Sequence, residues 1–301
     1  MRFFLGFMWV LHWLPLPVLA RLGEALGTVL FWVMRPRRDI ALTNLRLCFP
    51  NLSDAERAML AKEHFQAYAR SILERGILWW GSEDRLRKLI VIEPEVPLQK
   101  IRSSPTILLC PHFVCLDVAG AVVAMHTGGS SVYAQQKNRI FDAALRRGRA
   151  RFKPVHLFTR TEGIRQIVRL MRNGVPYFML PDMDFGIKDA EFVTFFGTPA
   201  ATLIAPARLA AMGAKVIPVV ATYLPGYRGW KVKFYPEWQD FPGSDIVAAT
   251  RRMNAFIEER VAEAPAEYLW THRRFKTRPA GAPSVYQSTI PIRAQSQPKP
   301  E

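Results

Sequence analysis

Residues 106–126 of the 301-residue chain read TILLCPHFVCLDVAGAVVAMH. The first five residues form a short apolar run that ends at Pro111, a pattern typical of a buried strand. The apolar stretch at 115–126 is longer and favours a helix. We therefore predict a strand at 106–110, a turn through His112, and a helix over 115–126.

The same alternation continues along the chain. Further strand candidates lie at 132–134, 155–158, 177–180, 216–221 and 231–235, and helix candidates at 139–150, 162–173, 200–212 and 245–262. Strands that alternate with helices indicate βαβ units. The predicted fold class is therefore α/β, with a largely parallel central sheet flanked by helices. Ligands of such folds bind at the carboxyl ends of the strands.

The N-terminal segment is apolar enough to meet a membrane. Residues 3–20 carry no charge and a second apolar run covers 25–34. Because Pro15 and Pro17 would kink a straight span, a bent or interfacial anchor helix is favoured. A signal peptide cleaved after Ala20 and a buried amphipathic helix are the alternatives.

Three basic residues follow that segment and bear on its orientation. Arg35, Arg37 and Arg38 would hold the rest of the chain on the cytoplasmic side. Further on, Ser53 and Glu56 form a capping box ahead of a long helical pattern that reaches Trp80. We expect an anchor at 1–38, an α/β domain at 39–278, and a flexible tail at 279–301 that is rich in Pro, Gln and Ser.

Composition narrows the class of protein. The chain is 50% hydrophobic and 22% charged, as in folded proteins, and its net charge of +16 favours anionic partners. Its three cysteines lack a paired metal-ligand spacing, so neither a disulfide framework nor a zinc site is indicated. Between residues 137 and 172 eleven basic residues face two acidic ones, which predicts docking of a phosphorylated ligand or an acidic protein. No nucleic-acid-binding module accompanies them.

His112 and Asp117 are the strongest candidates for chemistry. Residues five apart cannot share a helix face, so His112 belongs in the turn and Asp117 in the first helical turn, where the chain folds back. We then expect the Asp117 carboxylate to hold the imidazole of His112. In this arrangement His112 is the base that deprotonates a hydroxyl of the substrate, and Asp117 is the acid that orients it. A strand-ending His and a helix-capping Asp also occur together by chance.

Two later segments suggest substrate contacts. Asp182 and Asp184 follow a strand candidate and point to one face of an extended chain, so both could contact an acceptor, although a structural turn remains an alternative. Gly197 and Thr198 precede Pro199 and look like a helix start whose free amides would favour an anion.

His112 with Asp117 resembles the HxxxxD motif of the glycerolipid acyltransferase superfamily, and the chain to about residue 279 resembles the bacterial lipid A late acyltransferases. The distinctive pieces are 136–138, 146–152, 181–186, 195–202 and 270–276. Asp117 stands where many lipid A members have glutamate, and Met183 where a polar residue is expected between the aspartates.

The resemblance implies an inner-membrane enzyme with its active site facing the cytoplasm and with no metal or bound cofactor. Acyl carrier protein or coenzyme A would deliver the acyl chain, and a phosphorylated glycolipid, by this resemblance a lipid A precursor, would accept it. Arg149 is the expected oxyanion or phosphate donor, and Arg160 a substrate contact. Another phospholipid or glycolipid acceptor is one alternative, and a basic membrane-binding or nucleic-acid-binding protein without catalysis is a more distant one.

Overall fold

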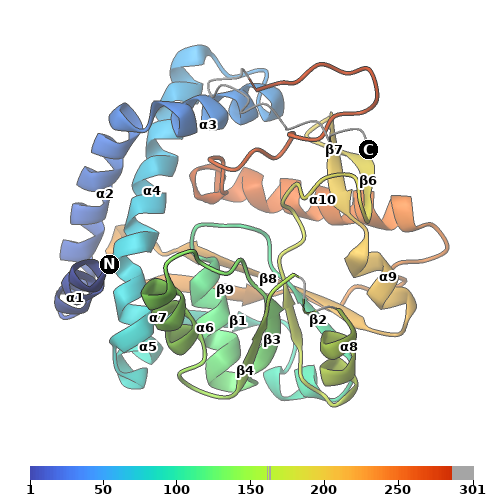
Figure 1. The fold of residues 1–301 in the computed structure, drawn as a ribbon, viewed down its shortest axis with the longest axis horizontal. Coiled ribbons are helices and arrows are strands. Elements are labelled where there is room, and N and C mark those ends of the chain that lie inside the picture. Colours follow the sequence, from blue (N-terminus) through green and yellow to red (C-terminus); the bar gives the residue numbers. More distant parts are fainter. Residues whose placement is uncertain (161, 163, 287–301) are drawn as a thin grey trace, which may run out of the picture.

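The computed structural model describes residues 1–160, 162 and 164–286. Its first part is a helical layer, on the left of Figure 1, that precedes every strand. The layer consists of α1 (Arg2–Leu11), α2 (Leu16–Val33), α3 (Arg35–Cys48) and α4 (Asp54–Trp80). The predicted capping box begins α4: Ser53 accepts from the Glu56 amide and Glu56 accepts in return from Ser53.

Seven strands form one mixed sheet in the order β1-β9-β8-β2-β5-β3-β4. They are β1 (Ile90–Pro94), β2 (Thr106–Leu109), β3 (Gly129–Val132), β4 (Val155–Phe158), β5 (Tyr177–Met179), β8 (Lys215–Tyr223) and β9 (Trp230–Phe234). Among the strand pairs of this sheet that the structure describes, β8–β9 is antiparallel and the others are parallel. The predicted α/β class with a largely parallel sheet is confirmed.

Helices cover both faces of this sheet. They are α5 (Glu83–Leu89), α6 (Leu116–His126), α7 (Arg139–Arg149), α8 (Ile164–Arg172), α9 (Ala205–Ala211) and α10 (Ile246–Glu263), with short 3₁₀ turns at Leu98–Arg102, Pro225–Tyr227 and Pro265–Glu267. Side chains of β2 alternate between the two faces: Leu108 packs with the core under α6, whereas Ile107 and Leu109 pack with the core under α8, α9 and α10.

A β-hairpin replaces part of one predicted helix. Strands β6 (Ala190–Phe195) and β7 (Thr198–Leu203) pair antiparallel, and α9 begins only at Ala205. The two residues that join the strands, Phe196 and Gly197, both have positive φ, 47° and 76°, as a two-residue hairpin turn requires. The prediction that Thr198 begins a helix is therefore wrong. Strand β3 also lies earlier than the predicted 132–134.

The N-terminal apolar segment bends and lies against the body of the protein. Residues 12–15 separate α1 from α2, and Pro15 stands at the N-terminus of α2. A Cβ atom at Gly23 or Gly27 would come within 2.6 Å or 2.4 Å of the backbone of α4, so these glycines permit the close packing of α2 on α4. By length and composition α2 could cross a membrane, with a third of it buried in the protein; core helices and signal sequences meet the same criterion.

The two domain boundaries expected from the sequence, after residues 38 and 278, fall inside a helix and inside the C-terminal segment. Residue 38 lies within α3, not in a linker. Of the expected tail at 279–301, residues 287–301 lie outside the described residues, while Tyr286 is buried. The Tyr286 hydroxyl donates to the Asn44 amide oxygen and accepts from the Phe275 amide, so this residue ties the C-terminal segment to α3.

Candidate active site

The register of β2 and β5 brings His112 and Asp182 together. These strands are parallel neighbours in which Leu109 pairs with Met179. His112 and Asp182 each follow three residues after that pair, so both reach the carboxyl edge of the sheet at the same point. The Cys110 amide continues the ladder with a 2.8 Å bond to the Met179 carbonyl.

Asp182 holds both the ring and the backbone of His112. His112 Nδ1 lies 2.7 Å from Asp182 Oδ1, and the His112 amide donates to Oδ2 at 3.0 Å. Burial acts to raise the pKa of Asp182, but its contacts with His112 outweigh burial and lower that pKa to about 2. The ionised carboxylate therefore accepts from Nδ1–H, which leaves Nε2 free to accept a proton. Asp182 is 1% exposed, whereas the His112 side chain keeps 13% of its surface open.

Asp117 does not hold His112, and that prediction is wrong. Asp117 lies in the first turn of α6 as expected, but its Oδ1 accepts from Nη2 and Nε of Arg149 at 2.6 and 3.0 Å. Its Oδ2 lies 3.0 Å from Nε of Arg75. The first turn of α6 faces α7 and α4, which supply these arginines. Burial acts to raise the pKa of Asp117, but the two guanidinium groups lower it below its usual value.

Arg75 was missed by the sequence analysis, because it lies on α4, 42 residues before Asp117, with no local motif around it. Two guanidinium groups share one carboxylate, so the cluster carries a net positive charge. The Arg149 side chain is 29% exposed, and within the described part of the chain its Nη1 has no hydrogen-bond partner. This nitrogen can donate to a ligand.

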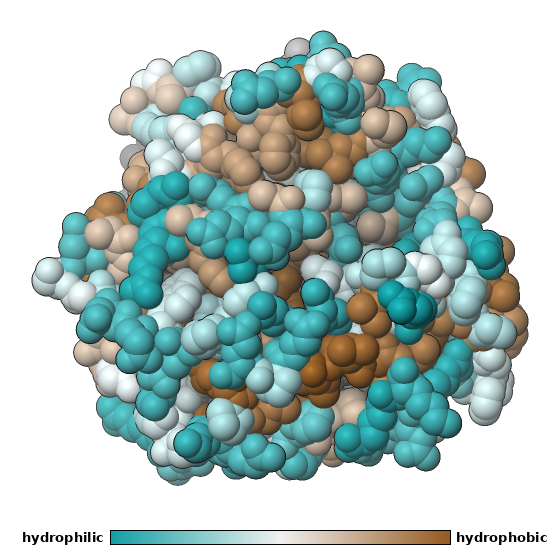
Figure 2. Space-filling view, turned by 180° about the vertical axis from the view of Figure 1, so that it is seen from behind, coloured by the Kyte–Doolittle hydropathy of each residue, from teal (hydrophilic) through white to brown (hydrophobic). Residues whose placement is uncertain are grey.

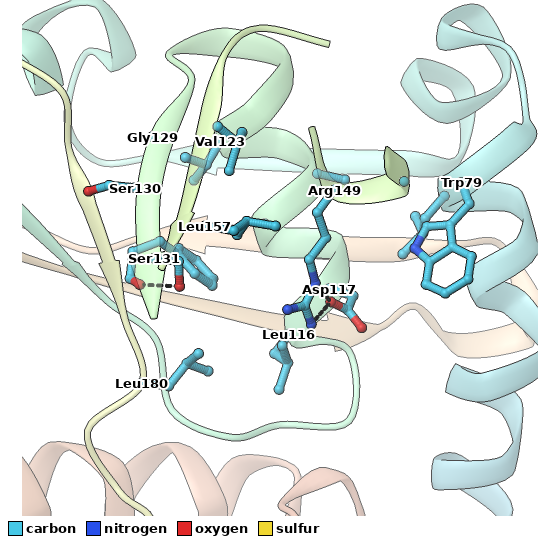
Figure 3. A pocket seen from close by; sticks show the side chains of 16 residues that line it. Trp79, Leu116, Asp117, Val123, Gly129, Ser130, Ser131, Arg149, Leu157 and Leu180 are labelled. Atoms are coloured by element: carbon cyan, nitrogen blue, oxygen red, sulfur yellow. Dashed lines mark hydrogen bonds and ion pairs between the residues drawn. The ribbon is translucent and has the colours of Figure 1, made fainter. Parts of the chain in front are cut away.

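An apolar pocket opens beside this charged cluster (Figure 3). It holds about 650 Å³ of empty space, its open mouth included, between α6, α7, the end of α4 and strands β3, β4 and β5. Asp117, Arg149, Leu116 and Leu180 line it near the carboxyl edge of the sheet, and its other walls include Trp79, Ala121, Val123, Leu157 and Phe178. Leu180 precedes Asp182 by two residues and Leu116 follows His112 by four, which places the pocket next to the His112 loop.

A glycine shapes one wall of this pocket. A Cβ atom at Gly148 would lie 2.3 Å from Cδ1 of Trp79, so only glycine lets the last turn of α7 lie against that indole. Arg149 is the next residue. The close packing of α7 on Trp79 therefore helps to set where the Arg149 guanidinium lies.

Asp184 and His272 complete the inner side of the site. The Asp184 carboxylate is buried and accepts from the amide and the hydroxyl of Thr277 at 2.6 and 2.7 Å. The Asp184 amide donates to Nε2 of His272 at 3.2 Å. Burial, with His112 close by, lowers the pKa of His272 to about 4, so this ring is neutral at pH 7. Because Asp182 and Asp184 are both buried on internal partners, this geometry does not support the expected acceptor contacts.

The remaining predicted residues lie apart from the pocket lining. The Arg160 guanidinium stacks 4.0 Å over the ring of Phe185, which follows Asp184. Gly197 and Thr198 belong to the β6–β7 hairpin and offer no helix N-terminus to an anion. Among the described residues, no three His, Cys, Asp or Glu side chains gather as metal ligands would.

Comparison with known proteins gives one consistent family. Residues 2–277 match the family model described as bacterial lipid A biosynthesis acyltransferase. The chain is 31% identical to the lipid A biosynthesis palmitoleoyltransferase of Escherichia coli K12, over 94% of this chain and 93% of that protein. It is 29% identical to the lauroyltransferase of that strain, over 94% and 93%, and 30% identical to its myristoyltransferase, over 90% and 84%.

Proposed function

The chain belongs to the bacterial lipid A biosynthesis acyltransferase family, and on this premise we propose that it moves a fatty acyl chain from an acyl thioester to a hydroxyl of a lipid A precursor, with His112 as general base. As a member, it is an acyltransferase that acylates a lipid A precursor. The observation that supports the chemical step best is the His112–Asp182 pair beside an apolar pocket.

His112 moves the proton in this mechanism. Its Nε2 takes the proton of the acceptor hydroxyl while Asp182 holds Nδ1–H and stabilises the positive ring. The hydroxyl oxygen forms a bond to the thioester carbonyl carbon, and the carbonyl oxygen becomes an oxyanion. When the carbon–sulfur bond breaks, the thiolate takes the proton from Nε2, so His112 returns to its starting state.

Arg149 is the proposed donor to the oxyanion. Its Nη1 is free of partners within the described residues, while Asp117 holds its other nitrogens. A guanidinium that is fixed before the reaction stabilises developing charge without reorganisation. Asp117 and Arg75 then act as positioning residues: Asp117 fixes the guanidinium, and Arg75 keeps the cluster positive after Asp117 has neutralised one charge.

The apolar pocket is the proposed site of the acyl chain. Beyond the Asp117–Arg149 pair its lining is mostly apolar, and the hydroxyls of its two serines, Ser130 and Ser131, donate to backbone carbonyls, so a chain that enters the pocket buries methylene groups. Each buried methylene contributes about 0.8 kcal/mol. The thioester would then lie at the mouth, between Arg149 and His112.

Basic side chains gather on α7, beside the acyl pocket, and on α8, on the other face of the sheet. Helix α7 ends with Arg146, Arg147 and Arg149, and α8 carries Arg165, Arg169 and Arg172. Acyl carrier protein is acidic and coenzyme A carries phosphates, so both proposed donors complement these helices. If acyl carrier protein is the donor, salt should raise its KM more steeply than that of acyl-coenzyme A, because its docking surface is larger.

The exposed face of α2 supports association with a membrane, which we propose to be the inner membrane on its cytoplasmic side. Val18, Leu22, Leu26, Val29 and Val33 recur three or four residues apart and are exposed. Figure 2 shows apolar surface on the side where α1 and α2 lie. Because the opposite face of α2 is buried on α4, a helix lying in the membrane surface fits better than one that crosses it.

The His112→Ala variant tests this mechanism. We expect turnover to fall by about 10²–10⁴ while the thermal transition stays unchanged. Labelled acyl thioester and purified lipid A precursor, separated by thin-layer chromatography, measure the transfer. Normal transfer by this variant would remove His112 from the mechanism, and no transfer by the parent protein would reject the proposed reaction.

A further inference from the structure

A second pocket lies between α3 and the C-terminal segment, away from the acyl pocket. It holds about 710 Å³ of empty space, its open mouth included. Its lining comprises Pro36, Asp39, Ile40, Leu42, Thr43 and Arg46 of α3, with Arg273, Val285 and Tyr286. None of these residues takes part in the mechanism above.

The charge of this pocket is positive and unbalanced. Within the described residues neither Arg46 nor Arg273 has an ion-pair partner, and Arg273 only lies 5.7 Å from the Tyr286 ring centroid. The one acidic side chain in the lining, Asp39, lies 3.8 Å from Arg38 and is offset by it. One guanidinium group comes from α3 and the other from the C-terminal segment, and a pair of this kind suits a phosphate, which has several accepting oxygens.

The pocket begins where the apolar face of α2 ends. Trp32, Val33 and Met34 are exposed, and Pro36 of the pocket lining follows two residues later. Helix α3 leads from the end of α2 to Arg46, twelve residues after Met34, so the pocket extends from the membrane face of α2 along α3. A phosphate held there would be part of a lipid whose chains remain in the bilayer.

The pocket and the active site share one segment of chain. The Asn44 amide of α3 donates to the carbonyls of Trp270 and His272, both at 2.7 Å. On its other side His272 accepts from Asp184, two residues after Asp182. A ligand beside Arg273 is therefore one short segment away from the His112 loop.

We propose that Arg46 and Arg273 bind a phosphate of the acceptor lipid and so present its sugar hydroxyl to His112. The proposal rests on the proposed function, because it needs a phosphorylated glycolipid as acceptor. The pocket is a binding site, and neither arginine takes part in proton transfer. Arg46 and Arg273 would supply positive charge to the phosphate of the acceptor, whereas the Asp117–Arg149 cluster lies at the acyl pocket.

The test compares two acceptors in the full-length protein: a phosphorylated lipid A precursor, and the same lipid after phosphatase treatment. The ratio of their kcat/KM values measures recognition of the phosphate. We expect Arg46→Gln and Arg273→Gln each to lower this ratio by about tenfold or more, because hydrogen bonds between charged groups are lost. Arg46→Lys should recover part of the ratio, because it keeps the charge. Arg208→Gln is the control and should leave the ratio unchanged, because Arg208 is an exposed arginine on α9 that pairs with Asp189 and lines neither pocket.

Three results would overturn the proposal. The first is an unchanged ratio in both variants, and the second is an equal loss on both acceptors, which would indicate a disturbed fold. The third is an unchanged kcat/KM ratio together with weaker flotation of the variants on vesicles that contain phosphatidylglycerol. This result would mean that the arginines bind anionic membrane lipids in general and not the acceptor. If the parent protein acylates neither lipid, the proposed function fails. The pocket is then tested by flotation on phosphatidylcholine vesicles that carry either lipid, where preference for the phosphorylated one must depend on Arg46.

Discussion

Replacing Asp182 by asparagine should damage turnover far more than its small change in shape suggests. Asp182 accepts from two N–H groups of His112, the ring Nδ1–H and the backbone amide. An amide has one accepting oxygen and no charge. In the place of Oδ1 it can still accept from both N–H groups, which lie 2.7 and 3.2 Å from Oδ1, but as a neutral acceptor; in the place of Oδ2 it leaves the NH₂ group facing the ring. If that NH₂ faces Nδ1, the ring must carry its proton on Nε2 and cannot act as a base.

The expected loss follows from these two contacts. In either orientation both contacts lose their charged acceptor; because a hydrogen bond to a charged group contributes about 1.5–3 kcal/mol, the transition state is weakened by up to about 3–6 kcal/mol. At about 1.4 kcal/mol per factor of ten, turnover falls by about 10²–10⁴. The acceptor KM should change little, because Asp182 is buried and contacts His112, not the substrate.

Steady-state acyl transfer gives kcat and KM, and ¹⁵N shifts of histidine-labelled protein report which nitrogen of His112 is protonated. Asp184→Asn is the matched control, because Asp184 is equally buried in the same loop but holds Thr277. It should lower kcat by less than about tenfold. The reasoning is refuted if Asp182→Asn turns over within tenfold of the parent protein, or if both variants lose activity equally.

Three further predictions concern the acyl pocket, a buried acid and the membrane face. Gly120→Leu should shift the preferred donor to shorter acyl chains, because a Cβ atom at Gly120 meets only Phe178, at 4.0 Å, and a larger side chain would fill the pocket. The expected loss in kcat/KM is about fourfold for each methylene excluded. Gly120→Ala is the control, and an unchanged activity profile across thioesters of graded length would show that the pocket does not select the chain. Burial raises the pKa of Glu267 to about 7, so the folded protein binds an extra proton, and its free energy of unfolding should fall by up to about 1.4 kcal/mol per pH unit as the pH rises from about 5 to 8. In denaturant titrations Glu267→Gln should make this dependence on pH shallower. If the free energy of unfolding of the variant depends on pH as steeply as that of the parent protein, other groups cause the dependence. Val29→Ser with Val33→Ser should reduce flotation with vesicles by about tenfold while the soluble fraction stays folded, whereas binding equal to that of the parent protein would place the membrane contact elsewhere.

Local patterns were sufficient for much of the fold. The apolar run at 106–110 followed by Pro111 predicted β2 and the turn that holds His112, because strand and turn preferences act over a few residues. The prolines at 15 and 17 predicted the bend between α1 and α2. The β6–β7 hairpin was missed because Thr198 and Pro199 also fit a helix start, and only pairing with β6 distinguishes the two.

The acid that meets His112 could not be found from local patterns. The sequence placed His112 at the end of a strand and Asp117 at the start of a helix, and both positions are correct. No local pattern in the sequence, however, predicts that β2 lies beside β5. The hydrogen bonds that pair these strands join residues 70 positions apart, as does the contact of His112 with Asp182. Once those strands pair in register, Asp182 stands level with His112, and Asp117 is left to the arginines of α4 and α7. Residue types and their spacing thus determine which groups can react, whereas the order of strands determines which of them touch.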